Sequence, residues 1–180
     1  MKVFRLLIIC MLFESLAFAK ATEILPAPIL EIQAIQMKQG VCETRWPELS
    51  ENYGIKKVTL DEGATLWLVP CAYWSANLAW SVFVTIKESS HPDGFLTKAI
   101  RFVNYHPYEG IVARDVIHNI DWDSANQVLR SQYYMNGSSL CGSRAEFKWH
   151  PGYQTFQVKT LLKKDDCRDP EESWKPVFNP

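Results

Sequence analysis

Short runs of apolar, β-branched and aromatic residues recur along the chain and predict strands. The predicted strands cover residues 55–60, 65–69, 78–86, 99–105, 128–135, 145–149 and 155–161. The run 78–86 (LAWSVFVTI) is long, aromatic and β-branched, which is typical of a central strand. In 145–149 and 155–161 apolar and polar residues alternate, which indicates strands with one buried and one wet face.

Turn residues between these runs favour antiparallel hairpins. Asp61-Glu62-Gly63 separates the first two runs, Asn136-Gly137 follows 128–135, and Pro151-Gly152 separates the last two. One helix is expected at 28–38, where Ile29, Ile32 and Ile35 recur near helical spacing. We therefore predict a mainly β fold, or an α+β fold with few short helices, built as an antiparallel sandwich or a strongly curved sheet.

The first 19 residues have the pattern of a secretory signal peptide. Lys2 and Arg5 precede the apolar run 6–13, and Ala17-Phe18-Ala19 matches a small-x-small cleavage site, so we expect cleavage before Lys20. No later segment approaches the roughly 20 apolar residues of a spanning helix. The mature protein is accordingly expected to be periplasmic or secreted, without a transmembrane segment.

After the signal peptide at 1–19, we expect an N-terminal segment at 20–45 with a short helix and one disulfide-stapled, β-rich domain at 46–180. No internal repeat, low-complexity tract or linker interrupts this domain.

The four cysteines that remain after signal removal predict two disulfides. They are Cys42, Cys71, Cys141 and Cys167, and an even count in an oxidising compartment indicates disulfides. Four cysteines allow three pairings, of which Cys42–Cys71 with Cys141–Cys167 is the simplest. No two of them lie within four residues of each other, so zinc-site spacing is absent.

Composition excludes several classes of function. Lys and Arg number 19 against 20 Asp and Glu, giving a net charge of −1, so no strongly basic field exists for nucleic acid. The chain has no Gly-rich phosphate loop, no nucleophile elbow and no Ser-x-x-Lys motif. We expect no cofactor and no metal, and we expect a non-enzymatic protein rather than an enzyme.

The histidines and carboxylates supply the remaining candidates for catalysis. His91, His106 and His150 each precede a proline, which is typical of turns and strand ends. His118 with Asp121 and Asp123 would form a base or a weak metal site, but an Asx-type turn explains the Asp-rich stretch more simply. An envelope hydrolase would need two paired carboxylates, for which the candidates are Glu62, Glu109, Asp121 and Asp123.

Loop aromatics give the candidate contact surface. Tyr73 and Trp74 follow Cys71 in a segment that is predicted to be a loop, and Tyr105, His106 and Tyr108 form a second aromatic loop. Rigid aromatic anchors are typical of binding surfaces, although small β domains also use aromatics to fill their cores.

Two cysteine-containing motifs resemble a family of secreted bacterial proteins, domain of unknown function 1176. The first is LWLVPC at 66–71, followed by Asn77, and the second is CGS at 141–143. The pair Trp149 and Phe156, the stretch 121–129 and the ending Cys167 with Trp174-Lys175-Pro176 are also similar to that family, over 46–178 in all. Two positions depart from the family pattern, at 74–76 (WSA, where Gly-Ala-Tyr is usual) and at Leu140, where Asp is common.

The resemblance implies export, small size and disulfides, and it assigns no activity to any residue. Together with the missing catalytic motifs, it favours an exported binding protein for another protein or a cell-envelope glycan. An envelope hydrolase and a structural envelope protein are the alternatives.

Overall fold

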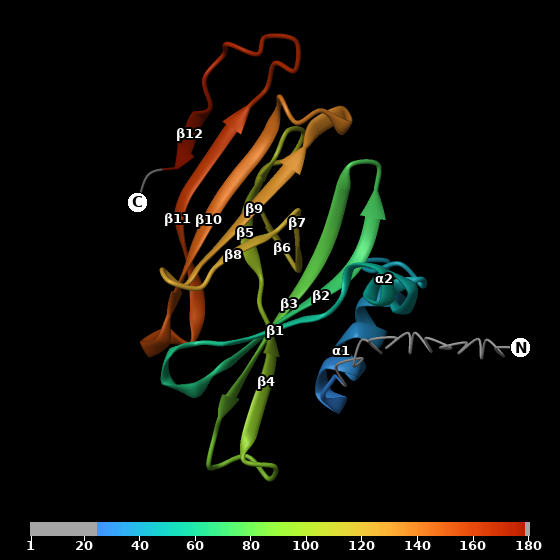
Figure 1. Cartoon of the computed structure of the whole chain (residues 1–180), viewed down its shortest axis with the longest axis vertical. Coiled ribbons are helices and arrows are strands. Elements are labelled where there is room, and N and C mark those ends of the chain that lie inside the picture. The colour runs from blue at the N-terminus through green and yellow to red at the C-terminus, as the bar shows by residue number, and fades with distance from the viewer. Residues whose placement is uncertain (1–24, 179–180) are drawn as a thin grey trace, which may run out of the picture.

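The computed structural model describes residues 25–178, so the predicted signal peptide lies outside the described residues. Two helices precede the strands (Figure 1): α1 (Ala27–Lys38) and α2 (Trp46–Tyr53). The strands are β1 (Lys56–Thr59), β2 (Thr65–Trp74), β3 (Asn77–Lys87), β4 (Phe95–Ala99), β5 (Phe102–His106), β6 (Gly110–Arg114), β7 (Val116–His118), β8 (Asp121–Asp123), β9 (Val128–Tyr134), β10 (Gly142–His150), β11 (Thr155–Lys164) and β12 (Lys175–Phe178). The predicted mainly β fold is confirmed.

All strand pairs are antiparallel within the described residues. One sheet has the order β1-β2-β3-β4, with β7 also pairing with β3. A second sheet has the order β12-β11-β10-β9-β8, and β5 and β6 form a separate hairpin. The predicted hairpins at 61–63 and 151–152 are present, as β1–β2 and β10–β11.

The two larger sheets pack face to face over the main core. Leu66 and Leu68 of β2 meet Leu129 of β9 and Phe147 and Trp149 of β10 in one buried cluster. The alternate residues of β2, Trp67 and Val69, face the other way and pack against α1. Strand β2 is therefore buried on both faces, which explains its unbroken apolar sequence.

Helix α1 covers the outer face of the first sheet. Its Ile29 is fully buried against Trp67 and Phe83, whereas Leu30 and Ile35 are exposed. The helix begins after Pro26, with proline again at the second position, which suits the unpaired N–H groups of a first turn. The sequence prediction for 28–38 is confirmed.

Two local predictions differ from the structure. The expected strand 99–105 is divided, because β4 ends at Ala99 and β5 begins at Phe102 in a different sheet. Tyr73 and Trp74 end strand β2 rather than forming a loop, and the hairpin turn is Ser75-Ala76, with Ser75 at φ 54°. In the tail, Trp174 stacks on Arg144, whose guanidinium carbon lies 4.0 Å from the centre of the ring.

Both predicted disulfides are present, as Cys42–Cys71 and Cys141–Cys167. The first joins the segment after α1 to a bulge in β2, where the register shifts between Pro70 and Ala72. A bulge accommodates Pro70, which has no N–H to give to the ladder. The second disulfide joins the start of β10 to the segment after β11.

Candidate functional site

A cleft of about 450 Å³ opens where the two sheets and the β5–β6 hairpin meet. Side chains from β2, β5, β6, β7 and β9, together with the segment after α1, line it. The lining residues are Gly40, Val41, Trp74, Arg101, His106, Ala113, Arg114, Asp115, Val116, His118 and Tyr133. Its volume is that of a small-molecule site.

Four rings in successive contact line the cleft, and we call them the ring row: Trp74, His118, Tyr133 and His106. Trp74 lies 6.0 Å from His118, measured between ring centroids. His118 meets Tyr133 edge to face at 5.1 Å, and Tyr133 lies 6.1 Å from His106. Outside the cleft, Tyr108 extends the row by an edge contact of 5.7 Å with His106. These spacings fall in the range of favourable aromatic pairs.

Strand alternation decides which aromatic of β2 reaches the cleft. Trp74 and Tyr73 are similarly exposed, at 45% and 43%, but successive strand residues point to opposite faces. Trp74 therefore faces His118, whereas Tyr73 stacks on Tyr53 of α2 at 6.2 Å. The two neighbours form a natural matched pair for mutagenesis.

His118 is largely buried in the middle of the ring row. Burial lowers its pKa from 6.5 to about 4, and the positive charges of Arg114 and His106 act in the same direction. The imidazole is therefore neutral at neutral pH. Its Nδ1 has no hydrogen-bond partner within residues 25–178, while the His118 backbone N–H donates to Ser131 Oγ at 3.2 Å.

Two ion pairs form the charged walls of the cleft. Arg101 Nε lies 2.9 Å from Asp115 Oδ1, and Arg114 Nη2 lies 2.5 Å from Glu109 Oε1. His106 Nδ1 is 3.3 Å from the same Glu109 oxygen, but the angle does not allow a hydrogen bond.

The Cys42–Cys71 disulfide holds one wall of the cleft. It fixes Cys42, and therefore the neighbouring Val41, against the end of β2. Glu43 reinforces this attachment twice: its N–H donates to the Cys71 carbonyl oxygen at 2.9 Å, and its carboxylate accepts from the Tyr73 N–H at 3.2 Å. The segment after α1 is consequently tied to the strand that carries Trp74.

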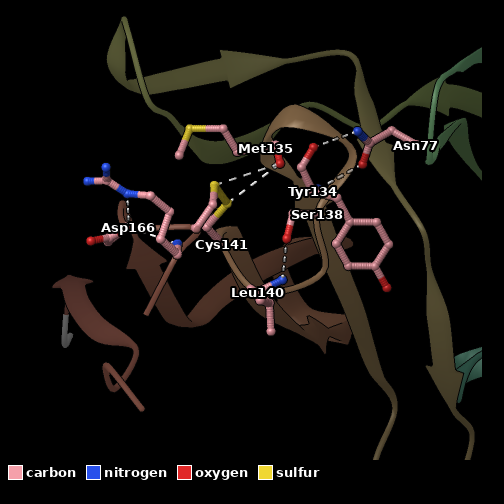
Figure 2. The surroundings of a disulfide bond; sticks show 9 residues. Asn77, Tyr134, Met135, Ser138, Leu140, Cys141 and Asp166 are labelled. Carbon is pink, nitrogen blue, oxygen red and sulfur yellow. Dashed lines mark hydrogen bonds and ion pairs between the residues drawn. A yellow bond between two sulfur atoms is a disulfide. The ribbon is translucent and has the colours of Figure 1, made fainter. Parts of the chain in front are cut away.

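The opposite side of the cleft depends on the end of β9. Figure 2 shows the Asn77 side chain directed at Tyr134, the residue after Tyr133 of the ring row. On the far side of this segment lies the second disulfide, whose Cys141 Sγ is 3.5 Å from the Met135 carbonyl oxygen. The two residues that follow Tyr133 are thus fixed by the Asn77 amide and by the second disulfide.

The structure brings together some of the predicted contact residues and separates others. Trp74 and His106 line the cleft, and Tyr108, with 84% of its surface exposed, lies beside it. Tyr73 and Tyr105 point elsewhere; the Tyr105 hydroxyl accepts a hydrogen bond from Lys163 Nζ at 3.2 Å. The contact function predicted for all five remains a prediction.

Sequence reasoning missed most of the remaining lining. Arg101, Arg114 and Tyr133 were not singled out as site residues, and His118 was considered only together with Asp121 and Asp123. The missed residues are dispersed between positions 101 and 133 and meet only because strands from three sheets converge. No local motif signals such a convergence.

Two of the carboxylates considered for hydrolysis, Asp121 and Asp123, lie in an ion-pair cluster away from the cleft, whereas Glu109 pairs with Arg114 at the cleft. Asp121 and Asp123 both contact Arg130, at 3.3 and 2.9 Å, and Glu146 contacts it at 3.2 Å. Hydrogen bonds from Asn126 and from Arg130 lower the pKa of Asp123 to about 2. A general acid needs a raised pKa, so Asp123 does not suit that role.

Asp123 and Asn126 also form the expected Asx-type turn, because the Asn126 N–H donates to the Asp123 carboxylate at 3.1 Å. Among residues 25–178, no group of three or more His, Cys, Asp and Glu side chains is placed to hold a metal ion. Over the same range, no helix is long and apolar enough to cross a membrane.

Fold and cleft together define a small β protein of two larger sheets and a separate hairpin, with two disulfides and a ring-lined cleft. Residues 16–179 match the model of a family described as "Protein of unknown function (DUF1176)", and the chain belongs to this family. Comparison with curated proteins and with solved structures finds no match.

The two family motifs have structural explanations. LWLVPC forms the doubly buried strand β2 and carries Cys71. In CGS, Cys141 forms a disulfide, Gly142 passes close to β9, and Ser143 Oγ donates to Asn104 of the β5–β6 hairpin at 3.3 Å. Both motifs therefore hold elements that border the cleft.

Proposed function

We propose that this is an exported, non-enzymatic protein, periplasmic or secreted, that binds another exported protein or a cell-envelope component through the ring-lined cleft. The observation that carries the proposal is the ring row itself. Trp74, His118 and Tyr133 form a contiguous aromatic surface whose outermost ring, Trp74, is 45% exposed. An exposed aromatic on a rigid support is a characteristic binding anchor.

Rigidity supports a binding role for the cleft. The rings project from strands rather than from loops, and both walls are attached through a disulfide or a buried amide. A preorganised surface loses little conformational entropy when a ligand binds. The family match and the two disulfides are compatible with export, because disulfides persist in oxidising compartments.

The test compares two variants of neighbouring residues. Wild-type protein, Trp74→Ala and Tyr73→Ala are immobilised and exposed to a cell-envelope extract, separated into protein and glycan fractions. We expect one fraction to be retained by wild type and by Tyr73→Ala and to be lost by Trp74→Ala. Equal retention by all three proteins, or retention by none, would overturn the assignment of the cleft as the binding site.

Export is tested separately by expressing the full chain in a bacterium that has a periplasm. The protein recovered outside the cytoplasm is expected to begin at Lys20. An intact N-terminus on protein that remains in the cytoplasm would contradict export.

A further inference from the structure

We infer that the ligand of the cleft is an acidic sugar, with Trp74 stacked on the sugar ring and the Arg101 and Arg114 guanidinium groups holding its carboxylate. This inference rests on the proposed function, since it names the chemistry of the ligand that the same cleft would bind.

Aromatic and hydrogen-bonding groups alternate around the cleft in a way that suits a sugar. A pyranose ring has a face of C–H groups and a rim of hydroxyl groups, so it needs a flat apolar partner and planar polar partners together. Trp74 offers the flat surface at the entrance. The His118 and His106 imidazoles and the Asp115 carboxylate offer polar groups on the remaining sides.

His118 contributes as a neutral group. Its burial, with Arg114 and His106 nearby, lowers its pKa and keeps the imidazole uncharged at neutral pH. Because Nδ1 is buried, a ligand hydroxyl group would meet the imidazole at Nε2, which donates or accepts a hydrogen bond according to the tautomer.

Two guanidinium groups stand at the cleft, and each has a carboxylate partner. Arg101 pairs with Asp115, and Arg114 pairs with Glu109. A ligand carboxylate would therefore be held by the guanidinium N–H groups that these ion pairs do not use, rather than by an excess of positive charge.

Both arginines retain donors for a carboxylate. Among residues 25–178, Arg101 forms its ion pair through Nε and Arg114 through Nη2. A guanidinium has five N–H donors, so each ion pair leaves others available. Arginine binds carboxylates in a fixed, often bidentate geometry, which gives selectivity as well as affinity.

A peptide ligand suits this cleft less well. Strand addition would use an unpaired sheet edge, and helix docking would use an apolar groove. The aliphatic side chains of the lining are only Val41, Ala113 and Val116, too few for an apolar groove. A saccharide is therefore the ligand class that fits this cleft better.

The test uses a tetrasaccharide of uronic acids and the same tetrasaccharide with its carboxyl groups reduced to alcohols. Affinities are measured by calorimetry for wild type, Arg114→Gln and Trp74→Ala. Arg144→Gln is the control, because Arg144 stacks on Trp174 outside the cleft. Circular dichroism and thermal unfolding of each variant establish that it is folded.

We expect wild type and Arg144→Gln to bind the acidic tetrasaccharide at least tenfold more tightly than the reduced one. Arg114→Gln should lose this preference while still binding the reduced sugar, and Trp74→Ala should lose affinity for both. Equal affinity of wild type for the two sugars, lost in Trp74→Ala, would overturn the acidic class and leave the proposed function standing. Binding of neither sugar would overturn the saccharide inference, and a Trp74-dependent protein captured from the envelope extract would then show that the cleft serves a protein partner.

Discussion

The Asn77 side chain and the Tyr134 backbone exchange two hydrogen bonds, each 2.8 Å long. Asn77 Nδ2 donates to the Tyr134 carbonyl oxygen, and the Tyr134 N–H donates to Asn77 Oδ1. The buried Asn77 amide thus takes the place of a pair of backbone hydrogen bonds between β3 and β9, which belong to different sheets. Asn119 completes the cluster, because its Nδ2 donates to Asn77 Oδ1 at 3.0 Å.

Replacing Asn77 with alanine should destabilise the fold strongly. The change leaves the Tyr134 N–H and carbonyl groups without their partner, and each buried unpaired group costs about 1–3 kcal/mol. We expect the free energy of unfolding to fall by about 2–4 kcal/mol in urea titrations.

Asn126→Ala is the control for this prediction. Asn126 also uses its amide, but on an exposed carboxylate at Asp123. We expect a loss below about 1 kcal/mol there. Equal losses of unfolding free energy for the two variants would show that the hydrogen bonds between Asn77 and Tyr134 are not important for stability.

Gly142 should not tolerate even a methyl group. Its φ is +127°, and a Cβ at this position would lie 1.9 Å from the Tyr133 carbonyl oxygen. Because backbone rather than a flexible side chain blocks the space, β9 and β10 would have to separate. We expect Gly142→Ala to cost more than about 3 kcal/mol of stability, measured by thermal or urea unfolding.

Gly152→Ala provides the comparison. Gly152 does not have a left-handed φ, and a Cβ added there would meet a His150 side-chain carbon at 3.4 Å as its nearest neighbour. The expected change is within about 0.5 kcal/mol. A Gly142→Ala protein as stable as Gly152→Ala would contradict the close approach of the two strands.

Acidification should destabilise the protein through His118. Its pKa is about 4 when folded and 6.5 ordinarily, so the unfolded state binds the proton more readily. Stability from this group is therefore complete above pH 6.5 and is lost as the pH falls from 6.5 to 4, by up to roughly 3 kcal/mol.

The measurement is urea unfolding at about pH 7, above the window, and at about pH 4.5, near its lower end, for wild type and His118→Gln. Wild type should lose more stability between the two pH values than the variant does. His91→Gln, in the turn after β3, should behave as wild type does. The His118 ring resonances should titrate near pH 4 by NMR, and a midpoint near 6.5 would contradict its burial.

Removing either disulfide should lower stability by a similar amount. The sequence separations of the bonded cysteines are 29 and 26, and in the chain-entropy account loops of this size contribute about 3–4 kcal/mol each. We expect Cys42→Ala/Cys71→Ala and Cys141→Ala/Cys167→Ala to show comparable falls in unfolding free energy.

Thiol alkylation checks the same bonds directly. The protein cleaved before Lys20 should yield no alkylated cysteine until it is reduced, and four after reduction in denaturant. Two or more reactive thiols in the unreduced protein would contradict the pairing.

The sequence pattern predicted the elements that have a clear apolar run or a clear alternation of apolar and polar residues. The alternation around Phe147 and Trp149 predicted the β10–β11 hairpin, and the apolar run through Trp67 predicted a strand, which the structure extends to Trp74. Helix α2 was missed because its eight residues bury only Leu49, which is too little for a helical pattern. The short strands β6, β7 and β8 contain no long apolar run and depend on their neighbours for pairing.

The candidate site was only partly predictable, for a geometric reason. Trp74 was identified as a contact residue from its place beside Cys71, although it lies on a strand and not in a loop. That it would face the cleft while Tyr73 would face α2 depends on the register of β2 with β3, which the bulge at Cys71 shifts. Register and sheet packing are tertiary properties, so composition and spacing did not reveal His118 or Tyr133 as its neighbours.

The four residues of the ring row do not lie in one continuous segment of the chain. Its members come from positions 74, 106, 118 and 133, on β2, β5, β7 and β9. No excised peptide or grafted loop would reproduce it, and a single backbone cut that released any one of these strands would dismantle it. Recognition by this cleft is therefore a property of the intact domain, so a mimic of its binding surface would have to copy the fold rather than a segment.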